Sequence, residues 1–177
     1  MSRRRWVFLL GLLAVIPMIG HAQGIVASPL VPYVRDLLVL QGDALVPLKS
    51  DECLKVPYTV LYFGAGWCPD CRRFSPELVA AYDGQPVGLK RFGVVLLTMD
   101  KTEEGMLQFM RTERMKWPAL AFAKAGSALD LRRYYSDRGI PCLAVIDPAG
   151  TIVLQSKTDR DATAVLRQLQ EKLKGGP

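Results

Sequence analysis

The chain has 177 residues and a net charge of +6, from 23 Lys and Arg against 17 Asp and Glu. This length suits one domain whose hydrophobic core needs no disulfide staples. No cluster of basic residues with interleaved aromatic residues supports nucleic-acid binding. Charged residues interrupt every apolar run after the first, so no later segment of the sequence resembles a membrane span.

The N-terminus predicts a secretory signal peptide, residues 1–22, that is cut after Ala22. Arg3–Arg5 supply its positive start, residues 6–19 form an apolar run, and small residues flank the cleavage site. Because the run is shorter than the roughly 20 apolar residues of a membrane span, an uncleaved anchor is the alternative. The signal predicts export, in a bacterium to the periplasm, where oxidising conditions allow disulfides to form.

Cleavage would remove His21, the only histidine. A mature chain without histidine excludes Ser-His and Cys-His nucleophile pairs and His-containing zinc and copper sites. A four-cysteine zinc site usually contains two close pairs, whereas this chain has one, within the set Cys53, Cys68, Cys71 and Cys142. The sequence therefore predicts no metal and no organic cofactor.

Strands and helices alternate after an irregular lead-in at 23–36. Apolar and β-branched runs bounded by turn residues predict a hairpin within 37–48 and strands at 58–63, 92–98, 119–122, 142–146 and 151–155. Helical spacing of apolar residues predicts helices after Cys68, after Thr102, at 125–135 and at 159–172. Helical crossovers imply parallel strands, and the tight last hairpin implies an antiparallel pair. The predicted fold class is α/β, with a mixed central sheet flanked by helices and an N-terminal β-hairpin extension.

The stretch WCPDC opens the helix that follows the strand at 58–63. Cys68 occupies the cap position, and Pro69 the first helical position, where its missing N–H costs nothing. Asp70 lies in the first turn, where the helix dipole favours an acid. Pro76 falls inside the helix and predicts a kink.

Cys68 and Cys71 could be a redox couple, half of a metal site, a structural staple or two core cysteines. Residues i and i+3 at a helix start share a face, and disulfides join Cα atoms about 5.5–6 Å apart. Unpaired N–H groups and the helix dipole stabilise a thiolate on the first cysteine; Arg72 and Arg73 add to this effect, and Asp70 opposes it. Because a bridge over so short a loop would stabilise little, the redox couple is the preferred interpretation.

WCPDC after an apolar strand resembles the thioredoxin superfamily. More narrowly, YFGAGWCPDCRRFSPELVAAYD and LRRYYSDRGIPCLAVIDPAG are similar to the tryparedoxin and nucleoredoxin branch. The resemblance covers roughly residues 37–172 and implies a thioredoxin-like fold with thiol–disulfide oxidoreductase activity.

The resemblance also implies roles for single residues. Cys68 would be the attacking cysteine and Cys71 the resolving one, joined as a redox-active disulfide in the oxidised state. Trp67 would shield the site, and Pro69 and Asp70 would help to shield it and to dock the substrate. Ile140–Pro141 would be a cis peptide that faces the cysteines and docks substrate backbone.

The sequence departs from the family pattern at three positions. Tyr62 stands where many thioredoxins carry a buried acid, so no carboxylate is assigned to take the proton from Cys71; Glu77 is expected to be solvated. Cys142 follows the proline where the family commonly has threonine, and Cys53 has no counterpart.

Cys53 and Cys142 are both predicted to be free. Cys53 precedes the strand at 58–63, whereas Cys142 opens a strand near the other end of the sheet. A strand spans roughly 17 to 20 Å, which is beyond the reach of a disulfide. Cys142 is therefore either a small core residue or a third thiol that modulates the couple.

These features predict an exported thiol–disulfide oxidoreductase, with residues 37–177 as a monomeric thioredoxin-like domain. Cys68 would attack disulfides of protein substrates and Cys71 would resolve the mixed disulfide. Reduction is the preferred direction, with electrons from a membrane thiol–disulfide carrier. The alternatives are a disulfide oxidant or isomerase, and a client-binding module whose cysteines are idle.

Overall fold

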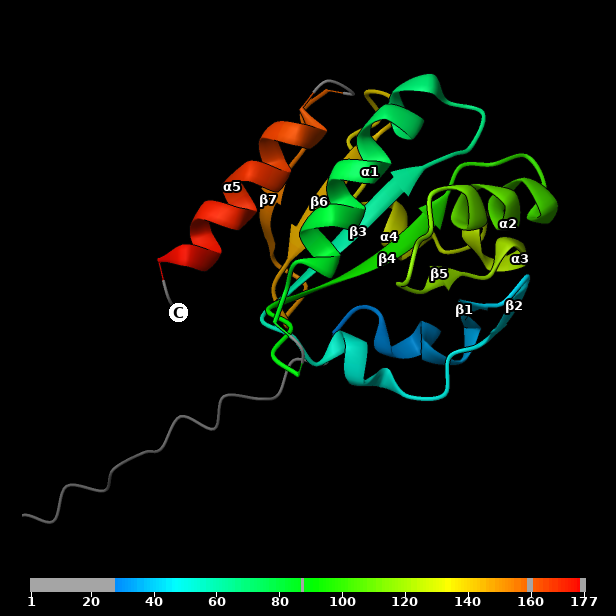
Figure 1. Cartoon of the computed structure of the whole chain (residues 1–177), viewed down its shortest axis with the longest axis horizontal. Helices are drawn as coiled ribbons and strands as arrows, with labels where there is room; N and C mark the ends of the chain where they lie inside the picture. Colours follow the sequence, from blue (N-terminus) through cyan, green and yellow to red (C-terminus); the bar gives the residue numbers. More distant parts are fainter. Residues whose placement is uncertain (1–27, 87, 159–160, 176–177) are drawn as a thin grey trace, which may run out of the picture.

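The computed structural model describes residues 28–86, 88–158 and 161–175 (Figure 1). The predicted signal peptide at 1–22 lies outside these residues. None of the helices in the described ranges has the length and apolar character needed to cross a bilayer.

A mixed sheet of seven strands forms the centre of the described chain, in the order β2-β1-β5-β4-β3-β6-β7. The strands are β1 (Leu37–Gln41), β2 (Ala44–Pro47), β3 (Tyr58–Gly64), β4 (Phe92–Thr98), β5 (Ala119–Leu120), β6 (Cys142–Ile146) and β7 (Ile152–Gln155). The central strand β3 pairs in parallel with β4 and antiparallel with β6. The hairpin β1–β2 joins the sheet through an antiparallel pair with β5. The predicted α/β fold with a mixed sheet and an N-terminal hairpin is confirmed.

The helices agree with the sequence prediction except in three places. They are α1 (Pro69–Asp83), α2 (Glu103–Thr112), α3 (Phe122–Ala125), α4 (Leu129–Arg132) and α5 (Ala162–Lys174), with 3-10 helices η1 (Val31–Asp36) and η2 (Asp51–Leu54). The single helix predicted at 125–135 is wrong: Gly126 caps α3, and the Ser127 hydroxyl donates to the Lys124 carbonyl, so the first helix ends there. The helix η2 was not predicted, and η1 lies in the lead-in that was expected to be irregular.

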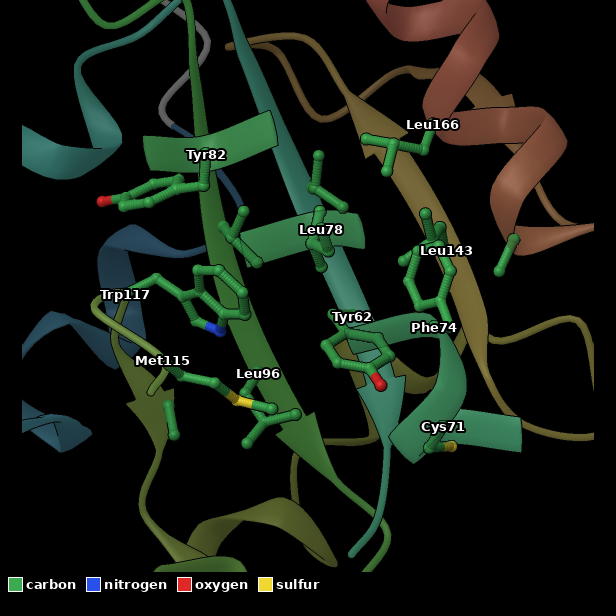
Figure 2. Close-up of a cluster of buried hydrophobic side chains, with 14 of the residues drawn as sticks. Tyr62, Cys71, Phe74, Leu78, Tyr82, Leu96, Met115, Trp117, Leu143 and Leu166 are labelled. Atoms are coloured by element: carbon green, nitrogen blue, oxygen red, sulfur yellow. The ribbon is translucent and has the colours of Figure 1, made fainter. Parts of the chain in front are cut away.

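The sheet separates two apolar clusters. One contains buried side chains of α1, α2 and α5, including Phe74 and Leu78, together with both cysteines of the WCPDC stretch (Figure 2). The other contains Leu30 before η1, and Leu131 of α4. Because side chains alternate along a strand, Tyr62 of β3 faces the first cluster and its neighbour Phe63 the second.

Candidate active site

Cys68 is the residue that precedes α1, as the sequence predicted. Its backbone is extended, Pro69 follows at the first helical position, and its sulfur accepts a hydrogen bond of 3.2 Å from the Cys71 backbone N–H. The sulfur therefore occupies the place of a capping oxygen, beside amides that have no partner within the helix. A hydrogen bond from a backbone N–H group to this sulfur favours the charged thiolate over the neutral thiol.

The second predicted part of the site lies against the first. The Ile140–Pro141 peptide bond is cis, and the Cys68 thiol donates to the Ile140 carbonyl oxygen over 3.4 Å. Only 5% of Cys68 is exposed, and Pro141 is buried. The loop before β6 thus covers the sulfur and offers it a backbone acceptor.

Cys71 lies one helical turn further along α1 and is fully buried. All four cysteines of the chain are free thiols in this structure. Burial raises the pKa of the Cys71 thiol, and a hydrogen bond with Cys68 raises it further; the Ala65 backbone N–H and the Tyr62 hydroxyl act in the opposite direction. Cys71 is therefore a thiol at neutral pH and needs help to ionise.

An acid that the sequence analysis missed holds the loop between β3 and α1. Asp100 accepts hydrogen bonds from the Gly66 backbone N–H at 3.0 Å and the Thr98 hydroxyl at 3.0 Å, and also from the Trp67 backbone N–H. Burial raises the pKa of the Asp100 carboxyl, and these hydrogen bonds lower it. The signal was available in the sequence, since Asp100 follows β4, and the carboxyl ends of parallel neighbours lie at one edge of a sheet.

Two further contacts fix the same loop. The indole N–H of Trp67 donates to the Met99 carbonyl at 3.1 Å, although the side chain is 54% exposed. The Arg72 guanidinium donates to the Gly66 carbonyl at 2.6 Å. Arg73, the other expected cation, is exposed and forms an ion pair with Asp70.

Open grooves flank the cysteines on two sides. One, of about 330 Å³, is lined by Trp67 and Arg72 together with residues of α2. The other, of about 480 Å³, is lined by Asp70, Phe74 and Pro141 and reaches the start of α5. Glu77 is exposed on this side and accepts a hydrogen bond from the Thr163 hydroxyl. Of the predicted docking residues, Trp67 lines the first groove, and Asp70 and Pro141 line the second.

The two remaining cysteines lie away from the pair. Cys142 points into the second apolar cluster, on the opposite face of the sheet from Cys71, with its sulfur 3.5 Å from the Ser136 hydroxyl. Cys53 belongs to η2, and its thiol pKa is raised mainly by burial. Within the described residues no three His, Cys, Asp or Glu side chains are grouped as metal ligands.

Comparison with known proteins gives consistent matches. A family model described as thioredoxin-like matches residues 57–152. Nucleoredoxin of Xenopus laevis is 32% identical over 124 residues, which are 70% of this chain and 28% of that protein. The chain therefore spans little more than a quarter of that relative. Native tryparedoxin I of Crithidia fasciculata superimposes with a TM-score of 0.60 at 28% identity, covering 81% of this chain and 94% of that one.

A structure of tryparedoxin II complexed with glutathionylspermidine also superimposes, with a TM-score of 0.60 at 25% identity, covering 82% of this chain and 96% of that one.

The predicted export to a bacterial periplasm is wrong. It depended on residues 1–22 alone, whereas the curated relatives matched by the folded part are nucleoredoxins of animals and plants, which are intracellular proteins. The fold of the described residues agrees with the tryparedoxin structures. The chain belongs to the thioredoxin-like family of oxidoreductases and is similar within it to tryparedoxins and nucleoredoxins.

Proposed function

We propose that the chain is a thiol–disulfide oxidoreductase that exchanges disulfides with protein cysteines through Cys68 and Cys71, mainly as a reductase. The observation that carries this proposal is the placement of the Cys68 sulfur between the Cys71 backbone N–H and the Ile140 carbonyl. A structural cysteine pair would not need to lie at a helix start beside a buried proline loop and two open grooves.

The proposed reaction has two exchange steps. The Cys68 thiolate attacks one sulfur of a client disulfide, so that a Cys68–client disulfide forms and the other client sulfur leaves as a thiolate. Cys71 then loses its proton and attacks Cys68, which releases the second client thiol. The client gains two electrons and the pair becomes the Cys68–Cys71 disulfide.

Regeneration needs a dithiol or thiol that reduces this disulfide. The membrane carrier was predicted only from the periplasmic location and loses its basis with it. By analogy with the tryparedoxin II complex, we propose a glutathione-type thiol as one reductant. The unit that we propose to act is a monomer of residues 37–177. The hairpin β1–β2 is included because β1 pairs with β5 in the same sheet.

The test is reduction of insulin disulfides with dithiothreitol as the electron source. Cys68→Ser should lower turnover at least 100-fold, because the attacking sulfur is lost. Cys71→Ser should also stop turnover but accumulate a mixed disulfide with the client, visible by mass spectrometry. Cys53→Ser is the matched control, since Cys53 lies in η2, away from the site, and it should keep activity within about twofold.

The same assay separates the alternatives. Turnover by Cys68→Ser close to the wild-type rate would contradict the assignment, and binding of clients without turnover would favour the module with idle cysteines. The direction depends on the reduction potential, which in such proteins lies between about −270 and −120 mV. A value near the reducing end, measured against glutathione, is expected for a reductase.

A further inference from the structure

Two buried hydroxyl groups lie beneath the start of α1. The Tyr62 hydroxyl and the Ser75 hydroxyl are 2.9 Å apart, and both residues are fully buried. The Tyr62 hydroxyl also acts as a hydrogen-bond donor that lowers the pKa of the Cys71 thiol. Figure 2 shows the Tyr62 oxygen directed to the side of the cluster on which Cys71 lies.

The surroundings fix the phenol in this position. Tyr62 packs edge-on against Phe74 with ring centroids 5.8 Å apart, and against Phe109 at 6.4 Å. A Cβ atom at Gly64 would lie 2.8 Å from the Tyr62 oxygen, closer than real contacts allow. The missing side chain at Gly64 therefore leaves the space in which the phenol reaches α1.

We propose that Ser75 and Tyr62 form a hydrogen-bond chain that ends on the Cys71 sulfur and stabilises its thiolate when Cys71 resolves the mixed disulfide. The inference rests on the proposed function and assigns a role at the position where many thioredoxins carry an acid. Tyr62 touches a reacting atom, whereas Ser75 acts through Tyr62 and is a positioning residue.

The donors of the chain can all point toward the sulfur. Ser75 donates to the Tyr62 oxygen, and Tyr62 donates its own proton to Cys71, so each bond polarises the next. Burial raises the pKa of Tyr62 well above its usual value. The phenol therefore remains a donor and does not act as the base; the Cys71 proton ends on the departing client thiolate.

Few other ionisable groups act on this sulfur. The side chains with which Cys71 interacts are Cys68 on its own turn and Tyr62 from β3. The elements packed over the phenol contribute aromatic rings, Phe74 from α1 and Phe109 from α2. No carboxylate is among these contacts, so the hydroxyl chain is the source of stabilisation that the site offers besides the Ala65 backbone N–H.

The test measures the two exchange steps separately. Resolution is followed as release of a client thiol from the Cys68 mixed disulfide, over a range of pH. Tyr62→Phe keeps the ring but removes the donor, and hydrogen bonds to charged groups are strong enough that resolution should slow roughly 10- to 100-fold at neutral pH. Its pH profile should shift to higher pH. Ser75→Ala should shift the profile in the same direction by less, and Ser75→Thr should restore it.

Controls keep the outcome unambiguous. In the Cys71→Ser background, Tyr62→Phe should leave the rate of mixed-disulfide formation nearly unchanged, and Ser75→Ala added to Tyr62→Phe should slow resolution no further. The proposed hydrogen-bond chain would be overturned if Tyr62→Phe and Ser75→Ala both leave the pH profile of resolution unshifted. It would also be overturned if these variants slow mixed-disulfide formation and resolution equally. Absence of exchange in the wild-type protein would instead refute the proposed function, so the two failures are distinguishable. If Tyr62→Phe does not fold, the pH profiles of resolution in Ser75→Ala and Ser75→Thr test the same hydrogen-bond chain.

Discussion

Asp100 holds the loop between β3 and Cys68 and does not itself touch the attacking sulfur. Its carboxylate accepts the backbone N–H groups of Gly66 and Trp67, which directly precede Cys68. Trp67 is held to the neighbouring Met99 carbonyl by its indole N–H. The loop that aims Cys68 is therefore held mainly by the residues that follow β4.

Replacement of Asp100 by Ala should loosen this loop. The change leaves backbone N–H groups without an acceptor, which costs about 1–3 kcal/mol for a buried group. We expect a lower melting temperature and an approximately tenfold slower formation of the mixed disulfide, measured in the Cys71→Ser background. Glu103→Ala is the control, because this exposed acid lies in the first turn of α2, and neither quantity should change much. Unaltered kinetics in Asp100→Ala would show that the loop holds its shape by itself.

The residues of the site differ in how far sequence can predict them. Cys68, Cys71 and Pro141 lie in local patterns that fix their place at a helix start or before a strand. Asp100 follows a buried strand, which indicates the edge of the sheet where it lies but not its partners, and Ser75 carries no such pattern. Both roles depend on which strands and helices become neighbours. Tyr62 was noticed only as a missing acid, and its contact with Cys71 required the packing of α1 on β3.

At the scale of elements, η2 packs tightly on the start of β4. Gly93 pairs with Thr59 across the parallel ladder. A Cβ atom at Gly93 would overlap the Cys53 carbonyl oxygen of η2. Since the contact is with backbone, no side-chain rotation can relieve it, and the approach of η2 requires glycine here.

Gly93→Ala should therefore destabilise the fold by about 1–3 kcal/mol, as overpacked sites do. Gly126→Ala is a matched control: no atom lies within 4 Å of its Cβ position, and its φ of −75° suits alanine. Such a change leaves stability equal or raises it by up to about 1 kcal/mol. Urea denaturation of both variants measures the difference. Equal midpoints would mean that η2 shifts freely away from β4.

The periodicity of apolar residues predicts the long helices and strands. The strands at 58–63, 92–98 and 142–146 were predicted within one residue of β3, β4 and β6. Short elements escaped, because a pattern of a few residues has no clear period. Thus η2 was missed, and the segment at 125–135 was joined into one helix although Gly126 divides it.

At the scale of the whole molecule, the sheet keeps Cys53 and Cys142 apart. Cys53 lies against Gly93, which pairs with Thr59, whereas Cys142 pairs with Phe63. The four residue-to-residue steps from Thr59 to Phe63 along β3 span about 13 Å, and a disulfide requires Cα atoms within about 7 Å. The fold therefore prevents a second disulfide within one chain.

This separation predicts the thiol count of the protein. After oxidation of the Cys68–Cys71 pair, the native protein should expose one slowly reacting thiol to Ellman's reagent, because Cys53 is partly exposed and Cys142 is fully buried. The reaction should accelerate as pH rises above neutrality, since burial raises the pKa of Cys53 and its thiolate forms only in alkaline solution. In denaturant two thiols should react, and Cys53→Ser should remove the native one while leaving one in denaturant. If fewer than two thiols react in the oxidised, unfolded wild-type protein, Cys53 and Cys142 form a disulfide, which would contradict their separation by the sheet.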